Sequence, residues 1–452
     1  MAPGELTRAT AIGLARMIAG GEVSSCEVVE AHLRRIADVN PAVNAVVVLD
    51  AARALARARE ADAARARGRP CGPLHGVPFT VKDNIAAAGL PMAIGAPERV
   101  GAVAGADATV VARLKAAGAI LLGKTNCPPW GGGTETDNEV YGRTSNPYDL
   151  TRTPGGSSGG EAAIVAAGGS PCGLGTDSGA SVRLPAHFCG LASIKPSAGR
   201  VPLTGVLDDG GQLGALADPR TQVGPLARSV ADAALLLRLI AGPDGRDAAV
   251  VPVALGDPDG VALRTLRVAV HAEDGLATPT RETVATVERA ASVLRGAGAR
   301  VEAARPPAGG HEITLEVWRS YGGDMRSEEL YGLLRRWDAF RAEMLAWVER
   351  YDVVLSPVFP GPARRHGQMD IPGELEPTSF TTPYNLTGWP AATVRCGTSP
   401  EGLPIDVQLA ARPWRDDVAL AAALRLEDEL GGWRPPVEDP TAAQVGNASP
   451  IT

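Results

Sequence analysis

The spacing of apolar residues predicts helices in the N-terminal part of the chain. Residues 8–67 repeat apolar side chains at helical intervals, and two adjacent serines are suited to cap a helix. One short apolar run interrupts this pattern and predicts a strand. In chain order, the predicted elements are a helix over Ala11–Ile18, a helix from Ser24 or Ser25 to Val39, a strand over Asn44–Leu49 and a helix over Asp50–Arg67.

From Leu74 to Gly210 the pattern changes to short apolar runs that alternate with Gly-rich turns and helical patches. Such alternation is typical of a sheet with helices on its faces, and it predicts a mixed, largely parallel sheet. The predicted elements are strands over Val77–Val81, Ala119–Gly123 and Pro171–Gly175, with a helix over Ala106–Gly118.

The C-terminal half predicts a second, smaller α/β unit followed by a long helical stretch and further strands. The unit comprises a strand at Leu266–Val270, a helix at Arg281–Gly296 and a strand at Ala299–Ala304. After the helical stretch at 312–349 come strands at Asp352–Ser356, Ala391–Arg395 and Pro404–Ala410, and a helix at Asp417–Leu430.

The length of 452 residues exceeds the size at which single cores usually stop growing. We therefore expect the fold class α/β, with a large mixed sheet covered by helices on both faces and a smaller α/β insertion. The predicted division is a helical region at 1–70, a core with the candidate catalytic residues at 71–240, a small α/β subdomain at 241–310, the remainder of the core at 311–435 and a flexible tail at 436–452.

Composition and charge exclude several classes of function. The net charge of −7 argues against a broad nucleic-acid-binding face. The six cysteines form no CxxC pair and the six histidines no HxH or HxxxH pair, so we expect no metal and no cofactor. The N-terminus MAPGELTRAT lacks signal-peptide features, and no run of about 18 apolar residues exists. We expect a cytoplasmic protein with no membrane anchor; a homodimer is left open.

The strongest local motif is the segment PGGSSGGE at residues 154–161, in which four glycines bracket Ser157 and Ser158 just before a helix. Glycines allow positive φ and close approach of the backbone, and a helix start offers unpaired N–H groups. The loop is suited either to cradle a phosphate or to present a serine to a carbonyl. A Walker-type phosphate loop requires a lysine where Glu161 stands, which disfavours nucleotide binding.

The second motif is GTDSGASVRLP at residues 175–185. Small residues before Ser181 predict a tight turn whose successive N–H groups converge on one oxygen, as an oxyanion hole requires. Asp177 and Arg183 have opposite charges and flank the turn, where an ion pair between them would brace it. The turn and its ion pair also have a purely structural interpretation.

The third motif is Lys82, at the end of a buried apolar run and directly before Asp83 and Asn84. Burial lowers the pKa of a lysine, and a neutral amine is a competent base. The alternative is an ion pair with Asp83 or another acid. No His and Asp stand at triad-like positions around Ser181, although His187 lies six residues further on, so a lysine acting through a second serine is the other source of a base.

Together these segments resemble the amidase signature family. The matching strings are VKDN, PGGSSGGEAAIVAAGG and GLGTDSGASVRLPAHFCG, supported by GKTNCPPW, EVYGRTSNPYDL, TTPYNLTGWPA and GLPIDVQLAARP. The resemblance extends from about residue 8 to residue 430. The motif sequences are most similar to those of the branch that includes fatty acid amide and aryl amide hydrolases.

The resemblance implies an amidase that cleaves a carboxylic amide through a Ser-Ser-Lys triad and an acyl-enzyme. By motif position, Lys82 is the base, Ser157 is the bridging serine, held by a cis peptide bond in the family, and Ser181 is the nucleophile. The implied oxyanion donors are the N–H groups of Ser178, Gly179, Ala180 and Ser181. Asp177 and Arg183 would support the turn, and the resemblance places Trp130, Gly131, Gly132 and Gly133 in the acyl pocket.

One residue departs from the family pattern. The family usually has glycine at the position of Ala180, and a positive φ there would strain an alanine by roughly 1 kcal/mol. We expect a soluble enzyme acting on a small or medium-sized hydrophobic linear amide. Three alternatives stay open: an acyl transferase in which an amine intercepts the acyl-enzyme, the A subunit of a tRNA-dependent amidotransferase, and a catalytically inactive scaffold.

Overall fold

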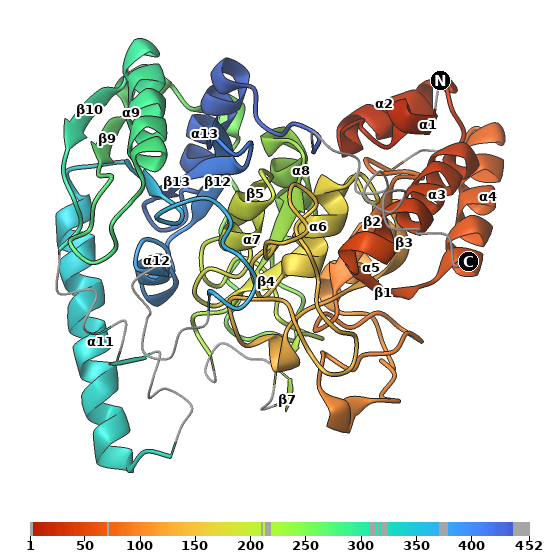
Figure 1. The fold of residues 1–452 in the computed structure, drawn as a ribbon, viewed down its shortest axis with the longest axis horizontal. Coiled ribbons are helices and arrows are strands. Elements are labelled where there is room, and N and C mark those ends of the chain that lie inside the picture. The colour runs from red at the N-terminus through yellow and green to blue at the C-terminus, as the bar shows by residue number, and fades with distance from the viewer. Residues whose placement is uncertain are drawn as a thin grey trace, which may run out of the picture.

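A single large sheet organises the molecule, whose structure is a computed structural model (Figure 1). It describes residues 3–69, 72–208, 211–212, 218–307, 313, 316–317, 324–369 and 378–436. Eleven described strands lie in the order β1-β3-β2-β4-β8-β5-β12-β13-β11-β9-β10, and β6 (Leu207–Asp208) and β7 (Gly211–Gln212) form a separate pair. The eleven are β1 Val46–Leu49, β2 Pro78–Lys82, β3 Ile120–Thr125, β4 Cys172–Asp177, β5 Ala192–Lys195, β8 Gln222–Ala227, β9 Arg267–Val270, β10 Arg300–Ala303, β11 Val353–Pro357, β12 Ala391–Thr398 and β13 Pro404–Ala411.

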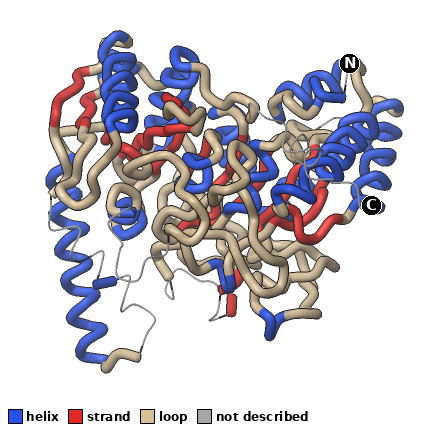
Figure 2. Tube along the Cα trace, in the orientation of Figure 1, coloured by secondary structure: helices blue, strands red, loops and turns tan. Residues whose placement is uncertain are grey.

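Helices cover both faces of this sheet, and Figure 2 shows the strands running through the middle between them. The helices described are α1 Pro3–Leu6, α2 Ala11–Gly20, α3 Ser25–Val43, α4 Ala51–Ala66, α5 Thr109–Ala116, α6 Gly159–Ala166, α7 Arg183–Phe188, α8 Val230–Ile240, α9 Arg281–Gly296, α11 Ser327–Val348, α12 Thr382–Leu386 and α13 Asp416–Leu430. Helices α5, α8, α9 and α13 pack into one core cluster, whereas α4, α6, α7, α11 and α12 contribute to clusters on the other side.

Alternation along the strands explains how one sheet supports two cores. On β11, Val353 and Leu355 belong to the cluster with α9 and α13, whereas Val354 between them belongs to the cluster with α11. Successive side chains of a strand point to opposite faces, so a strand that is apolar throughout is buried on both sides. This is why the central strands read as continuous apolar runs in the sequence.

The strand directions correct one expectation. Of the ten described strand pairs in the large sheet, four are parallel and six antiparallel, so the sheet is mixed as predicted but not largely parallel. Two of the six antiparallel pairs involve β8, which the sequence analysis did not predict. It lies between β4 and β5 and is antiparallel to both.

Most predicted elements are present, with shifted ends. Ser24 caps α3 through a capping box with Glu27. Strand β2 continues to Lys82 and β4 to Asp177, so both strands reach further than their apolar runs. Helix α5 begins at Thr109 rather than at Ala106. Part of the predicted helical stretch 312–349 and the tail from 437 lie outside the described residues, and α11 covers the rest of that stretch.

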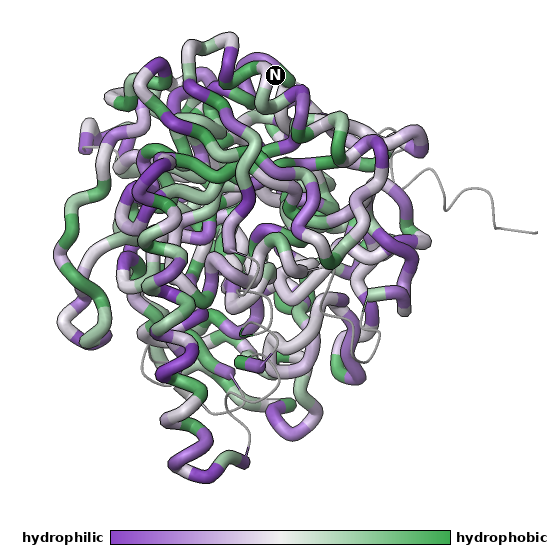
Figure 3. The backbone as a smooth tube through the Cα atoms, turned by 90° about the vertical axis from the view of Figure 1, so that its left-hand side faces the viewer, coloured by the Kyte–Doolittle hydropathy of each residue, from purple (hydrophilic) through white to green (hydrophobic). Residues whose placement is uncertain are grey.

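The segment 241–310 contributes β9, α9 and β10, and these strands extend the same large sheet beyond β11. This end of the molecule, with the long helix α11, lies opposite the N-terminal helices α1–α4 (Figure 1). Hydrophobic and hydrophilic segments alternate along the backbone, and hydrophobic stretches occur in the interior as well as in some outer segments (Figure 3). No helix in the described part of the chain has the length and apolarity needed to cross a membrane.

Close backbone contacts position α6, the helix that follows the Ser157 loop. A Cβ on Gly160 would lie 2.5 Å from the backbone N and 2.6 Å from the O of Asn126, and 2.8 Å from the O of Ala45. These neighbours are backbone atoms and cannot rotate away. Glycine at this position therefore lets α6 pack directly on the segment that follows β3.

We predict that Gly160→Ala destabilises the fold by about 1–3 kcal/mol, because the steric cost exceeds the helix propensity gain of roughly 0.5–1 kcal/mol. Gly296→Ala is the matched control, since Gly296 lies at the end of α9 with nothing within 4 Å of an added Cβ. Thermal or urea unfolding checks the comparison. Equal stability of the two variants would contradict the packing described.

Candidate functional site

Lys82 lies at the end of β2, fully buried, with its amine directed at two hydroxyls. Its Nζ donates to Ser157 Oγ at 2.6 Å and to Thr176 Oγ1 at 2.8 Å. Thr176 belongs to β4, which is parallel to β2, and its hydroxyl also accepts from Asn84 Nδ2 at 3.3 Å. The structure thus brings the predicted base and the predicted bridging serine into direct contact.

The alternative interpretation of Lys82, an ion pair with Asp83, is wrong. Asp83 pairs instead with Lys124 of β3, whose Nζ lies 3.0 Å from Asp83 Oδ1 and donates to the Asp83 carbonyl at 2.8 Å. Both residues of this pair are fully buried. Among the described residues, no carboxylate forms an ion pair with Lys82.

Burial therefore acts on the Lys82 amine with little compensation. It lowers the pKa of Lys82 to about 8, against the opposing influence of Cys127 and Asp177. A lysine with this pKa releases its proton close to neutral pH, whereas an ordinary lysine stays charged up to about pH 10. The site can thus supply a neutral amine under mild conditions.

The Ser157 loop is built on close contacts that exclude side chains. The Gly156–Ser157 peptide bond is cis, as the resemblance implied. A Cβ on Gly156 would lie 2.7 Å from Thr134 C, and one on Gly175 of β4 would lie 2.5 Å from Ser158 Oγ. Ser158 Oγ in turn donates to Thr176 O and accepts from Thr176 N, both at 3.3 Å. The loop is thereby joined to β4 beside Lys82.

Ser181 lies in the turn between β4 and α7 and is half-buried, whereas Lys82 and Ser157 are inaccessible. Its carbonyl accepts the N–H of Ser158 at 3.2 Å, which joins the turn to the Ser157 loop. The hydrogen bonds of the described residues include none between the Ser157 and Ser181 hydroxyls. Catalytic hydrogen bonds are often long before substrate binds, so this geometry is compatible with the predicted role of Ser181.

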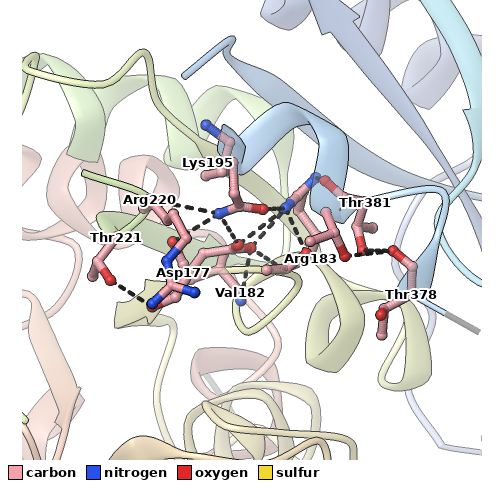
Figure 4. Close-up of polar contacts among 12 residues, drawn as sticks. Asp177, Val182, Arg183, Lys195, Arg220, Thr221, Thr378 and Thr381 are labelled. Atoms are coloured by element: carbon pink, nitrogen blue, oxygen red, sulfur yellow. Dashed lines mark hydrogen bonds and ion pairs between the residues drawn. The ribbon is translucent and has the colours of Figure 1, made fainter. Parts of the chain in front are cut away.

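A buried ion pair braces this turn (Figure 4). Arg183 donates from Nε to Asp177 Oδ2 and from Nη2 to Asp177 Oδ1, each at 3.0 Å, and neither side chain is exposed. Arg183 also holds Thr381 O at 2.9 Å and Gln408 Oε1 at 3.1 Å. Asp177 accepts the N–H groups of Val182 and Arg183 at 3.1 and 3.3 Å. Although burial opposes it, the charge of Arg183 lowers the pKa of Asp177 to about 2.

The brace also sets the direction of the peptides in the turn. The carbonyl of Asp177 accepts from Asn385 Nδ2 at 3.1 Å, that of Gly179 from Arg183 Nη2 at 3.2 Å and that of Ala180 from Leu184 N at 2.7 Å. In a planar trans peptide the N–H points opposite to the carbonyl. The N–H groups that follow, those of Ser178, Ala180 and Ser181, therefore point away from the brace. Within the described part of the chain they donate to no acceptor, which suits an oxyanion site.

Ala180 carries no backbone strain. The described non-glycine residues with positive φ are Asn44, Ile94, Trp130 and Trp414, so the concern raised by alanine at position 180 does not apply. Its methyl group is 4% exposed and belongs to a small apolar cluster with Leu184, Phe188, Phe359, Ala363 and Met369. Apolar side chains therefore adjoin one side of the turn.

Only part of the predicted acyl pocket lies next to Lys82, the predicted catalytic base. A Cβ on Gly131, whose φ is +73°, would come within 3.6 Å of Lys82 Nζ. Trp130 instead directs its indole N–H to Glu98 Oε1 at 2.9 Å, with the Arg99 guanidinium 5.5 Å from its ring centre. Gly132 and Gly133 are exposed. The structure thus places Gly131 beside Lys82, with Trp130 held by neighbouring charges.

Sequence reasoning missed the polar residues that hold the site together. Thr176 contacts Lys82 directly, and Thr381, Asn385 and Gln408 follow their partner Arg183 by 198, 202 and 225 positions. A signal existed for Thr176, which lies inside the GTDSG motif, but none existed for the distant partners. Both ring nitrogens of His187 have hydrogen-bond partners, the carbonyl of Gly361 and the N–H of Asp406, each at 2.9 Å. Within the described residues no group of His, Cys, Asp and Glu is arranged to hold a metal ion.

Comparisons with known proteins identify the family and the fold. The family model Amidase matches residues 27–328 and 322–420. The A subunit of the glutamyl-tRNA(Gln) amidotransferase of Roseiflexus castenholzii is 36% identical, over 89% of this chain and 92% of that protein. An acylamidase of Rhodococcus erythropolis is 35% identical, over 92% of this chain and 94% of that protein. The solved structure of 6-aminohexanoate cyclic dimer hydrolase with its substrate has a TM-score of 0.81 and 29% identity, covering 96% of this chain and 99% of that one.

The relatives span nearly the whole chain, and the expected family and fold are both confirmed. A large mixed sheet with the VKDN, GGSSGG and GTDSGAS motifs gathered at one site is what the sequence resemblance implied. The chain belongs to the amidase signature family.

Proposed function

We propose that this protein hydrolyses a linear carboxylic amide through an acyl-enzyme on Ser181, with Ser157 as the proton bridge and Lys82 as the base. The observation that most strongly supports this proposal is the 2.6 Å contact between Lys82 Nζ and Ser157 Oγ. The amine that makes it is buried and has no carboxylate partner among the described residues. A charged, ion-paired lysine would be a structural residue. An amine that loses its proton near neutral pH and contacts a serine hydroxyl is placed to act as its base.

The first half of the reaction follows from this arrangement. Neutral Lys82 accepts the proton of Ser157 as Ser157 accepts that of Ser181, and the Ser181 oxygen attacks the amide carbon. The N–H groups of the turn stabilise the oxyanion, because they are fixed before the charge develops. Ser157 then protonates the leaving nitrogen while Lys82 returns its proton to Ser157, and the C–N bond breaks to give the acyl-enzyme, a free amine and a neutral Lys82.

Water completes the cycle. It adds to the acyl carbon while its proton passes through Ser157 to Lys82, and the second tetrahedral intermediate expels Ser181 with return of a proton. The products are a carboxylic acid and the enzyme in its starting state. No redox or metal step is required for the atoms and charges to balance.

The neighbours of the turn support an uncharged hydrophobic acyl group. Ala180 adjoins Leu184, Phe359 and Met369, and the side chains of this cluster are apolar. The acylamidase and the cyclic dimer hydrolase among the relatives bear names of amide-cleaving enzymes. A small or medium-sized hydrophobic amide is therefore the proposed substrate class.

A second candidate is the A subunit of a tRNA-dependent amidotransferase. The relatives that bear this name favour it, since one aligns over 92% of its own length. In that role the same serine would take an acyl group from glutamine and release ammonia for a partner protein. Glutamine hydrolysis that depends on added partner subunits, together with failure to cleave hydrophobic amides alone, would establish this role. Product capture by added amines would instead indicate an acyl transferase.

We predict that a fluorophosphonate probe modifies Ser181 and that Ser181→Ala abolishes both labelling and amide hydrolysis. Lys82→Met should reduce the labelling rate and kcat by roughly 1,000-fold or more, because no other described side chain replaces the base. Mass spectrometry of the labelled peptide and initial-rate kinetics provide the measurement.

Lys195→Met is the matched control for this experiment. Lys195 is also a fully buried lysine, its pKa is lowered to about 7 by burial and by Arg183, and it donates to Pro196 O at 2.9 Å. That variant should keep the labelling of Ser181. Equal labelling of wild type and Lys82→Met would overturn the proposed mechanism.

A further prediction concerns Ala180. Ala180→Gly should shift selectivity toward bulkier acyl groups by about tenfold in relative kcat/KM, because one methyl group in an apolar pocket is worth roughly 1–3 kcal/mol. Ala363→Gly removes a methyl from the same cluster but not from the turn, and should lower stability without changing selectivity. A panel of amides with graded acyl size checks both variants. Unchanged selectivity in Ala180→Gly would dismiss a role for this methyl.

A further inference from the structure

Glu161 is a buried carboxyl that the proposed reaction does not use. It stands in the first turn of α6 and is fully inaccessible. Its Oε1 accepts the hydroxyl of Thr80 on β2, and its Oε2 accepts the hydroxyl of Thr125 on β3 at 2.9 Å. Among the described residues it has no cationic partner.

The contacts of Glu161 join the same part of the sheet to the same loop and helix as the contact between Lys82 and Ser157. Thr80 precedes Lys82 by two residues on β2, and Thr125 is the residue paired with Lys82 on the neighbouring strand β3. Glu161 follows Ser157 by four residues across the start of α6. Two links therefore connect the same strand to the same loop and helix, one through the reacting groups and one through the carboxyl.

The sheet is shaped to admit this carboxyl. A Cβ on Gly173 of β4 would lie 1.9 Å from Glu161 Oε1 and 2.6 Å from Thr80 O. Glycine at this position of β4 leaves the space that the carboxyl occupies between the helix and the sheet. Three strands thus contribute to its site: Thr80 from β2, Thr125 from β3 and the bare backbone of Gly173 from β4.

The electrostatic surroundings favour the neutral form of the carboxyl. Burial raises the pKa of Glu161 to about 8, and the two threonine hydroxyls only partly offset this. The ionisable groups on the strands packed against it are Lys82, Lys124, which is paired with Asp83, Cys172, and Asp177, which is paired with Arg183. A neutral carboxyl can bind hydroxyls without raising the pKa of Lys82, as a charged carboxylate would.

We propose that Glu161 is a positioning residue for this reaction: its carboxyl, bound by Thr80 and Thr125, fixes the start of α6 on β2 and thereby holds Ser157 at hydrogen-bonding distance from Lys82. This inference rests on the proposed function. A displacement of about 1 Å between reacting groups can cost a factor of about 100 in rate, so a polar link next to the relay has a direct kinetic consequence.

The test compares Glu161→Ala and Glu161→Gln with wild type. Glutamine keeps an oxygen and an NH2 group that can bond the two threonines, whereas alanine removes both contacts. We expect Glu161→Ala to lower kcat and the fluorophosphonate labelling rate by roughly 10- to 100-fold with KM little changed, and Glu161→Gln to stay within about threefold of wild type. Rates are normalised to the folded fraction measured by circular dichroism.

Glu427 provides a matched control on α13. It is another largely buried carboxyl with a raised pKa of about 7, and it accepts the N–H of Val230 at 3.0 and 3.1 Å. Glu427→Ala should lower the melting temperature but leave kcat and the labelling rate unchanged. If Glu161→Ala does not fold, Thr125→Val and Thr125→Ser replace it, with slower labelling expected for valine and retained labelling for serine.

Two results would overturn the proposal. One is a labelling rate in Glu161→Ala, or in Thr125→Val, equal to that of wild type, which would reduce the carboxyl to a structural role. The other is a loss in Glu161→Gln as large as in Glu161→Ala, which would assign the effect to a negative charge rather than to the link. Failure of the proposed function is distinguishable, because wild type itself would then show no labelling of Ser181.

Discussion

The proposed chemistry of this protein depends on a buried amine that has no carboxylate ion-pair partner among the residues that the structure describes. Two lysines reach the interior on neighbouring strands, Lys82 on β2 and Lys124 on β3. Asp83 neutralises Lys124 and leaves Lys82 facing only the hydroxyls of Ser157 and Thr176. Because desolvation is only weakly compensated at Lys82, its pKa falls to about 8. Lys124 on the neighbouring strand instead stays ion-paired with Asp83. This division of charge between two lysines on neighbouring strands distinguishes the proposed base, Lys82, from the ion-paired Lys124.

The second constraint is the direction of a few backbone amides. Carbonyls at Asp177, Gly179 and Ala180 are held on one side of the turn by Asn385, Arg183 and Leu184. Arg183 reaches in addition to Thr381 and Gln408, so the turn is oriented by segments from the far C-terminal part of the chain (Figure 4). A small site of three motifs thus requires the whole sheet, since β13 and α12 supply the groups that aim its N–H donors.

The sequence predicted the local parts of this arrangement and missed the long-range parts, for a physical reason. Apolar runs identified β2, β3 and β4, and the motif positions of Lys82 and Ser157 proved to be in contact. Strand β8 was missed because Gly224 and Pro225 interrupt its apolar pattern, and with it the antiparallel centre of the sheet. The pairing of Asp83 with Lys124 and the bonds of Glu161 join residues at least 36 positions apart, and no local pattern encodes them. The flexible tail and the division into subdomains stay predictions.

The most direct test of a neutral buried base is the pH dependence of the acylation rate of Ser181, measured by rapid mixing with an activated amide or a fluorophosphonate. Since the base acts in its neutral form and its pKa is about 8, the rate should rise with pH along a single ionisation near that value and then level off. In Lys82→Met this rise should disappear together with nearly all of the rate. A rate independent of pH from about pH 6 to about pH 9, or one preserved in Lys82→Met, would contradict a neutral buried amine as the source of the nucleophile's activation.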